Sequence, residues 1–255
     1  MILKFCRMLA AFFAFGTALS AQATIVEVTT NLGKFEINLY DDSTPVTVQN
    51  FLNYVSSGRY DGTVFHRSVP GFVLQGGGFR FEQQLPLVAT ATNPAIINEP
   101  KWSNVKATVA MAKLASDPNS ATNQWFINLA NNAANLNVQN GGFTVFGVVT
   151  GTGMSIVDSI NDLYVPGGAG LFNETPLRNY SATDWANKVP VTAANIVTIE
   201  RITIINDSPT TAANLNPAPN TLAGQGETEG ASSGSSAPTL LMVLAGLAFW
   251  RRRKV

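Results

Sequence analysis

The fold of this chain is decided by one stretch, Phe65-His66-Arg67-Ser68-Val69-Pro70-Gly71-Phe72-Val73-Leu74-Gln75-Gly76-Gly77-Gly78. Residues 64–69 favour a strand, and Pro70-Gly71 favours a turn because Pro fixes φ and Gly adopts positive φ. Residues 72–75 form a second strand, and three glycines end it where the backbone bends or approaches another group closely. Pairing of the two strands would bring Arg67 near Gln75. An apolar platform with one guanidinium and one amide suits peptide binding and is poor equipment for hydrolysis.

These residues resemble the signature of the cyclophilin-type peptidyl-prolyl isomerases, which reads Phe-His-Arg-x-x-Pro-Gly-Phe-x-x-Gln-Gly-Gly. Residues 110–113 with 119–127, and then residues 143–149, are similar to the second and third signatures of that family and follow in the same order. The resemblance covers residues 24–207. It implies a mainly β fold, namely a closed eight-stranded antiparallel barrel capped by two helices.

The composition narrows the classes of function. The chain has 255 residues, of which 13% are charged, against about 25% in an ordinary soluble domain. Without the six basic residues near its two ends, the chain has 10 basic against 16 acidic residues, a balance of −6. This balance argues against nucleic acid as a partner, because a nucleic-acid binder shows a basic patch.

Few residues are available for thiol or metal chemistry. The single cysteine, Cys6, lies near the N-terminus, and His66 is the single histidine. A zinc site or a Ser-His-Asp triad would have to use His66, and neither has its surrounding motif. We therefore expect no metal and no cofactor.

The N-terminal residues 1–23 have the features of a secretory signal peptide. Lys4 and Arg7 precede an apolar segment, residues 8–19, that is too short to span a bilayer. Ala21-Gln22-Ala23 fits the small-x-small pattern of a cleavage site. An uncleaved N-terminal anchor is the alternative.

The C-terminal residues differ in composition from the domain at residues 24–207. Residues 208–237 are rich in small and polar residues and are predicted to be a flexible, disordered linker. Residues 238–255 form an apolar run ended by four basic residues, similar to the sorting tails of exported Gram-negative proteins. Either processing of this tail or simple anchoring in a membrane is consistent with the pattern. We expect an exported protein of the periplasm, outer envelope or cell surface.

Periodicity places the elements of the domain. Alternation at residues 25–30 and 34–39 predicts a β-hairpin. Thr44-Pro45 predicts the start of a helix that Gly58 ends, with Thr44 as N-cap. A second helix is expected at 155–163, and further strands at 108–112, 124–129, 144–149 and 196–205. Residues 131–142 are expected to be irregular, and residues 164–190 a long loop.

The resemblance also implies roles for single residues. Arg67 would donate a hydrogen bond to the prolyl nitrogen, and Gln75 would hold Arg67 or the substrate carbonyl. Phe126 would act with them at the catalytic centre and form part of the proline pocket. The expected substrate-binding residues, including further pocket walls and the adjoining groove, are His66, Phe72, Val73, Ala112, Gln124, Leu136 and Phe143. His66 is expected to be neither acid nor base.

Two departures from the family pattern lie near the pocket. Val73 stands where many members have Met, and Lys113 stands where many have Asn, which adds a positive charge near the groove. The implied function is isomerisation of X-Pro bonds in exported proteins by a monomer whose partners are proline-containing polypeptides. The alternative is a non-catalytic peptide-binding or surface-displayed module that uses the same groove.

Overall fold

The computed structural model describes residues 24–168, 170–208 and 215–224. The predicted leader at 1–23 and the predicted sorting or anchor segment at 238–255 lie outside these residues. Much of the predicted linker at 208–237 also lies outside them. Within the described residues, no helix combines the length and apolar character needed to cross a membrane.

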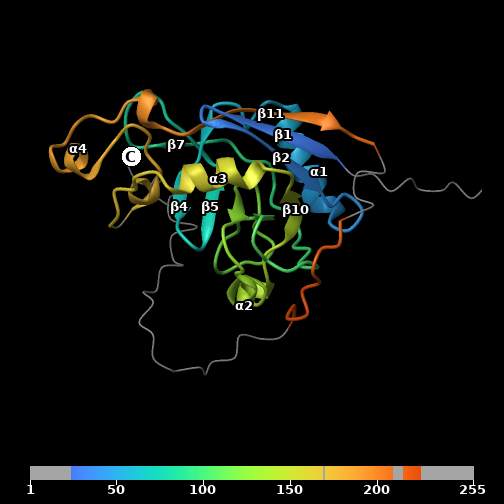
Figure 1. Ribbon diagram of the computed structural model, residues 1–255. Helices are drawn as coiled ribbons and strands as arrows, with labels where there is room; N and C mark the ends of the chain where they lie inside the picture. Colours follow the sequence, from blue (N-terminus) through green and yellow to red (C-terminus); the bar gives the residue numbers. More distant parts are fainter. Residues whose placement is uncertain (1–23, 169, 209–214, 225–255) are drawn as a thin grey trace, which may run out of the picture.

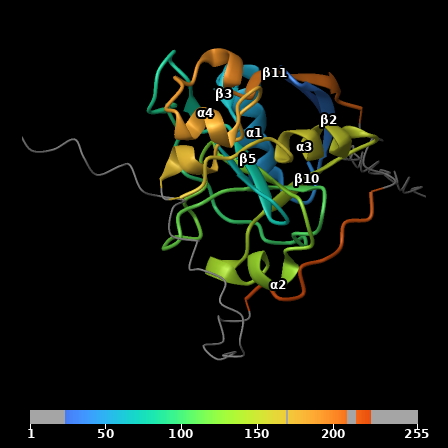
Figure 2. The ribbon, with the colours of Figure 1, turned by 60° about the vertical axis from the view of Figure 1, so that its left-hand side comes forward.

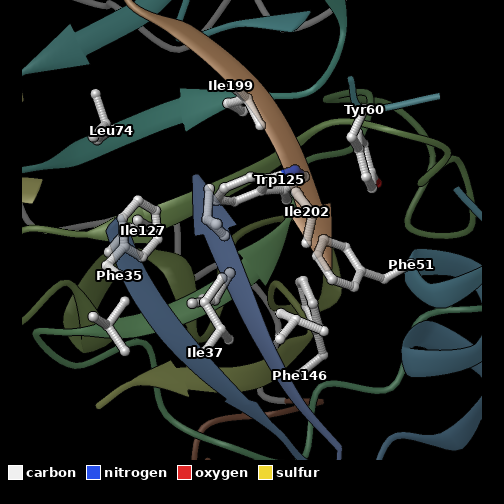
Figure 3. Close-up of a cluster of buried hydrophobic side chains, with 14 of the residues drawn as sticks. Phe35, Ile37, Phe51, Tyr60, Leu74, Trp125, Ile127, Phe146, Ile199 and Ile202 are labelled. Carbon is white, nitrogen blue, oxygen red and sulfur yellow. The ribbon is translucent and has the colours of Figure 1, made fainter. Parts of the chain in front are cut away.

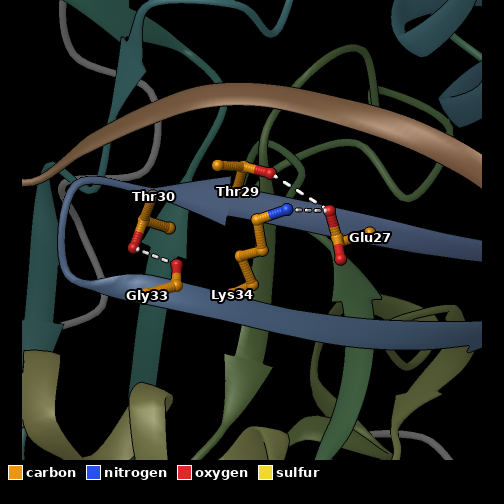
Figure 4. A network of polar contacts seen from close by, with 5 residues as sticks. All are labelled: Glu27, Thr29, Thr30, Gly33 and Lys34. Atoms are coloured by element: carbon orange, nitrogen blue, oxygen red, sulfur yellow. Dashed lines mark hydrogen bonds and ion pairs between the residues drawn. The ribbon is translucent and has the colours of Figure 1, made fainter.

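The predicted hairpin is confirmed as β1 (Ile25–Thr30) and β2 (Gly33–Leu39), which pair in antiparallel register. Figure 4 shows its turn end, where Lys34 Nζ lies 2.8 Å from Glu27 Oε1 and Thr30 Oγ1 donates to Gly33 O. An exposed ion pair of this kind contributes little stability. The register is instead fixed by the buried face, because a slip of one residue would turn Val28 and Ile37 to solvent.

The strands form one continuous antiparallel sheet (Figure 1). Its order is β4-β5-β9-β8-β10-β2-β1-β11-β3, with β6 and β7 continuing beyond β3. The remaining strands are β3 (Thr63–Val64), β4 (Arg67–Val69), β5 (Val73–Gly76), β6 (Phe79–Arg80), β7 (Val88–Ala89), β8 (Thr108–Met111), β9 (Trp125–Asn128), β10 (Val145–Val149) and β11 (Thr198–Asn206).

Closure of the barrel depends on the two residues between β3 and β4. The strand predicted at 64–69 is interrupted there, because β3 pairs with β11 whereas β4 pairs with β5. Phe65 N still donates to Val197 O and His66 N to Gln75 O, both at 3.1 Å. Counted as one interrupted strand, β3 and β4 complete an eight-stranded closed antiparallel barrel, so the predicted fold class is confirmed.

The barrel interior is filled by large apolar side chains (Figure 3). Trp125 is 0% exposed and meets the rings of Phe51, Tyr60 and Phe65 edge to face. Because side chains alternate along a strand, Ile127 shares this interior face with Trp125, while Phe126 between them points outward. Outward-facing side chains such as Phe126 can therefore form a site on the outer face of the barrel.

Two main helices pack on the barrel, as predicted. Helix α1 (Pro45–Ser56) supplies Phe51 to the core, and α3 (Gly153–Asn161) packs against β2 and β4. Thr44 is the N-cap residue of α1, but its side chain makes no capping bond; Thr44 Oγ1 donates to Tyr40 O instead. Helix α3 begins two residues before the predicted start.

Two regions predicted to lack regular structure contain short helices. The 131–142 segment forms α2 (Ala133–Leu136) and η1 (Gln139–Gly141). The 164–190 segment forms η2 (Leu171–Glu174) and α4 (Ala182–Ala186), with η3 (Ala193–Asn195) just beyond it. A capping box at Ser181 and Asp184 opens α4. Figures 1 and 2 both place α2 and α4 at opposite ends of the domain.

Part of the predicted linker packs against the domain, which corrects the expectation of a flexible segment for residues 215–224. Ser103 N donates to Ala218 O and Asn220 N to Lys101 O, both at 2.8 Å. Leu215 packs on the apolar cluster of the outer face. Composition pointed to too little apolar surface for a core, but this segment is held mainly by backbone pairing with the chain around Trp102. It passes close to α2 in Figures 1 and 2.

Candidate active site

The three predicted catalytic residues lie in one row across three strands. Arg67 on β4 is opposite Gln75 on β5, and Gln75 is opposite Phe126 on β9. The row continues through Ala110 to Val145. Directly opposed residues share one face of a sheet, and this row occupies the outer face of the barrel. The structure thus brings together the guanidinium, the amide and the ring that the sequence singled out.

An apolar cluster forms the floor and far wall of this site. It contains Val73, Ala112, Phe126, Leu136 and Phe143, with Phe72 packed against it and partly buried. The rings of Phe126 and Phe143 meet edge to face with centroids 5.7 Å apart. All the residues predicted for the proline pocket therefore belong to one cluster.

The same cluster includes residues that sequence reasoning missed. Tyr40, Ala110 and Val145 are buried in it, and Trp102 packs on it from outside. Burial raises the pKa of Tyr40 to about 12, so its hydroxyl is neutral. The alternation of outward residues on the strands at 108–112 and 144–149 was the available signal for Ala110 and Val145.

Arg67 is held by a partner that the sequence did not reveal. Its Nε donates to Glu174 Oε2 at 2.7 Å, and the two side chains are 11% and 23% exposed. The guanidinium carbon lies 5.7 Å from the centroid of the Phe72 ring. The charge therefore stands at the edge of the apolar cluster, between an aromatic ring and a carboxylate.

Gln75 bonds to Gln124 and not to Arg67, which was the first of its two expected partners; the second was the substrate carbonyl. Its Nε2 donates to Gln124 Oε1 at 2.9 Å, whereas the Nε atom of Arg67 is bonded to Glu174. Gln75 Oε1 is buried and has no hydrogen-bond partner among the described residues. Gln75 and Gln124 thus form an amide pair beside the pocket, and the main chains of Gln124 and Ala112 are joined by a 2.9 Å bond.

The glycines after Gln75 allow this close packing. A Cβ atom on Gly78 would lie 2.5 Å from Gln124 Cγ, and one on Gly77 would lie 2.7 Å from Asn123 O. Gly77 also has a φ of +87°, a region that L-residues with side chains rarely adopt. The prediction that the backbone closely approaches another group here is confirmed.

His66 lies behind the site rather than in it. The residue is 1% exposed, and its ring meets Phe79 with centroids 4.8 Å apart. Burial, with a smaller contribution from the charge of Arg67, lowers the pKa of His66 to about 3. The ring therefore presents almost no surface to a substrate, and its contact with the substrate stays a prediction; the neutral ring agrees with the expectation that it is neither acid nor base.

Lys113 does not add a free charge to the groove. The residue is 4% exposed, and its Nζ donates to Asn140 O at 2.5 Å and Gly142 O at 2.7 Å. Nζ also lies 5.0 Å from the centroid of the Phe143 ring. Burial lowers the pKa of Lys113 to about 8. Its role in this position is to tie the 140–142 turn to the pocket wall.

The chemistry open to this arrangement is limited to binding and hydrogen bonding. The site offers one guanidinium paired with a carboxylate, two amides and an apolar floor, and the histidine ring behind it is neutral and buried. Among the described residues, no three or more His, Cys, Asp or Glu side chains gather where they would hold a metal ion.

The signature blocks, the barrel and the outer-face pocket define a member of one family. Residues 25–184 match the family model described as "Cyclophilin type peptidyl-prolyl cis-trans isomerase/CLD". The chain therefore belongs to the cyclophilin-type peptidyl-prolyl cis-trans isomerases, the class of enzyme that the signatures predicted.

Particular relatives can be named. The chain is 44% identical over 151 residues to a peptidyl-prolyl cis-trans isomerase of Acinetobacter baylyi, covering 57% of this chain and 77% of that protein. It is 42% identical over 154 residues to peptidyl-prolyl cis-trans isomerase A of Dickeya dadantii, covering 59% and 78%. The corresponding values for isomerase B of Escherichia coli are 38% over 153 residues, covering 58% and 89%.

Solved structures support the fold. The crystal structure of a Cryptosporidium parvum cyclophilin-type isomerase, obtained in the presence of the dipeptide Ala-Pro, matches with a TM-score of 0.51 at 20% identity. The match covers 72% of this chain and 99% of that one.

Proposed function

We propose that this protein accelerates rotation about X-Pro peptide bonds, with Arg67 stabilising the twisted amide above the apolar pocket. The single observation that carries this proposal is the row of Arg67, Gln75 and Phe126 at the edge of that pocket. The names of the relatives, which are peptidyl-prolyl isomerases, support it.

The reaction needs no covalent chemistry. Rotation about a peptide bond faces a barrier of roughly 18–20 kcal/mol because amide resonance is lost, and uncatalysed X-Pro exchange takes tens to hundreds of seconds. At the top of the barrier the prolyl nitrogen regains its lone pair. A donor aimed at that nitrogen is therefore stronger in the transition state than in the ground state, which is the requirement for catalysis.

The site geometry suits this task. The apolar cluster around Phe126 would hold the proline ring, and the guanidinium of Arg67 stands at its edge above Phe72. Because Nε is occupied by Glu174, the terminal nitrogens of Arg67 are the groups that would meet the substrate. The amide pair of Gln75 and Gln124 would contact the peptide backbone beside the pocket.

The proposal is tested by measuring exchange of an X-Pro peptide with the full chain and with Arg67→Ala and Arg67→Lys variants. We expect Arg67→Ala to lower kcat/KM at least tenfold, which is about 1.4 kcal/mol of transition-state stabilisation. Arg67→Lys keeps the charge but not the planar fork, so intermediate activity is expected. Binding of the peptide by the wild-type protein without acceleration would instead identify a peptide-binding module.

We further propose that the clients are exported proteins. The support is the sequence pattern at residues 1–23 and the apolar and basic tail at 238–255. Intact-mass measurement on protein recovered outside the cytoplasm is expected to show loss of the leader and of residues 251–255. Retention of the four basic residues would favour simple anchoring through the tail.

A further inference from the structure

We propose that Glu174 is a positioning residue for Arg67, and that the turn carrying it belongs to the active site. This inference rests on the proposed function. It adds a carboxylate from a region of the chain that lies 107 residues beyond Arg67. The claim is that Glu174 fixes the direction of the guanidinium without itself touching the substrate.

The turn at η2 is tied to the strand that carries Arg67. Thr175, directly after Glu174, is 0% exposed, and its Oγ1 donates to His66 O at 2.9 Å. Thr175 N in turn donates to Phe172 O at 3.0 Å, which closes the turn. The backbone at Glu174 is therefore fixed relative to the residue directly before Arg67, so the ion pair joins two anchored segments.

Catalysis depends on which nitrogen of Arg67 is bonded to Glu174. A guanidinium is planar, so a bond through Nε restrains its orientation while leaving the donors on its two terminal nitrogens for the substrate. The Phe72 ring, 5.7 Å from the guanidinium carbon, limits the second direction of movement. Arg67 is thereby oriented before substrate binds, which avoids the loss of rate that a misplaced catalytic group causes.

Partial burial makes this pair stronger than an exposed one. The two side chains are 11% and 23% exposed, whereas those of Lys34 and Glu27 on the hairpin are 54% and 27% exposed. Charges sheltered from water are screened less by salt.

If the pair instead withheld Arg67 from the substrate, its removal would raise activity, so the direction of the change distinguishes positioning from autoinhibition.

The test compares Glu174→Ala, Glu174→Gln and a control, Glu200→Gln, which removes a carboxylate from an exposed position on β11. In the X-Pro exchange assay, Glu174→Ala should lower kcat about tenfold and Glu174→Gln about threefold, because Gln retains an oxygen acceptor for Nε. KM and the unfolding temperature should change little, and the control should match wild type.

Double variants test whether the effect passes through Arg67. In an Arg67→Ala background, Glu174→Ala should change kcat by less than about 1.5-fold, because coupled residues are not additive. An equal loss in both backgrounds, a rise in activity, or no change in the single variants would each overturn the inference.

A readout independent of activity separates this inference from the proposed function. The Arg67 Nε–H proton should give a protected NMR signal in the wild-type chain and in Glu200→Gln, and lose protection in Glu174→Ala. If the wild-type chain does not accelerate exchange, the proposed function fails. The inference then fails as well if the Nε–H signal is unprotected or is unchanged by Glu174→Ala.

Discussion

The two walls of the apolar pocket are held in different ways. The strand wall, made by Arg67, Val73, Gln75 and Phe126, belongs to β4, β5 and β9 and is fixed by the backbone ladder between them. The loop wall, made by Leu136 and Phe143, belongs to the irregular chain around α2 and η1. Backbone hydrogen bonds between paired strands form with almost any side chain, whereas the loop wall depends on hydrogen bonds from particular side chains.

Side-chain amides and one ammonium group hold the loop wall. Asn104 Nδ2 donates to Phe143 O at 3.2 Å, and Asn98 Nδ2 to Gly142 O at 2.8 Å. Lys113 bonds to the same turn from the pocket side, and Asn220 Nδ2 bonds to Asn137 O from the docked C-terminal segment. We infer that single substitutions should loosen this wall while leaving the strand wall intact.

The largest effect on stability is expected at Asn104. The residue is 0% exposed; its Nδ2 donates to Asn137 Oδ1, Leu136 O and Phe143 O, and its Oδ1 accepts from Asn128 Nδ2. Asn104→Ala leaves several of these buried groups unpaired, at about 1–3 kcal/mol each where no partner replaces the bond. We expect the free energy of unfolding to fall by about 3 kcal/mol. Chemical denaturation checks this value, with Asn53→Ala on the exposed face of α1 as control.

A smaller loss of stability is expected on acidification. It comes from protonation of His66, which lies behind the strand wall. The pKa of His66 is lowered from 6.5 to about 3 in the folded protein, so the unfolded chain binds the proton first as the pH falls. Stability from the neutral ring is therefore full above pH 6.5 and is lost as the pH falls towards 3. The slope is about 1.4 kcal/mol per pH unit, or roughly 2 kcal/mol at pH 5.

The control for this pH dependence is His66→Phe, which keeps a buried ring without a titrating group. Denaturation measured at pH 7 and pH 5 should show a smaller loss for the variant than for wild type. Equal losses would mean that His66 does not couple folding to protonation. The activity of both proteins should stay nearly constant from pH 6 to pH 7, because rotation about the X-Pro bond requires no proton transfer.

The sequence predicts the strand wall of this site better than the loop wall. The strand wall follows from Arg67, Gln75 and Phe126, because their signatures imply strands and pairing fixes the register. The loop wall was predicted only as far as Leu136 and Phe143, since an Asn-rich segment has no period from which α2 or its bonds can be read. The docking of residues 215–224 was missed because backbone pairing leaves no mark in composition.

Glu174 is another residue whose place in the site could not be predicted from the sequence. It lies in a segment that was predicted to be a loop, and its partner Arg67 is distant in sequence. A lone glutamate among Asn, Gly and Thr carries no signal of an ion pair. Lys113 was recognised as a charge near the groove, but its bonds to the carbonyls at 140 and 142 depend on the path of the chain.

The central claim is that catalysis depends on the cation of the strand wall, while the cation of the loop wall is structural. The most direct measurement compares kcat/KM for X-Pro exchange in the wild-type chain, Arg67→Ala and Lys113→Met, with Met chosen because it keeps the apolar stem of Lys. We predict a loss of at least tenfold for Arg67→Ala, about 1.4 kcal/mol or more, and of less than about threefold for Lys113→Met. Equal activity of wild type and Arg67→Ala, or a larger loss in Lys113→Met than in Arg67→Ala, would contradict the account.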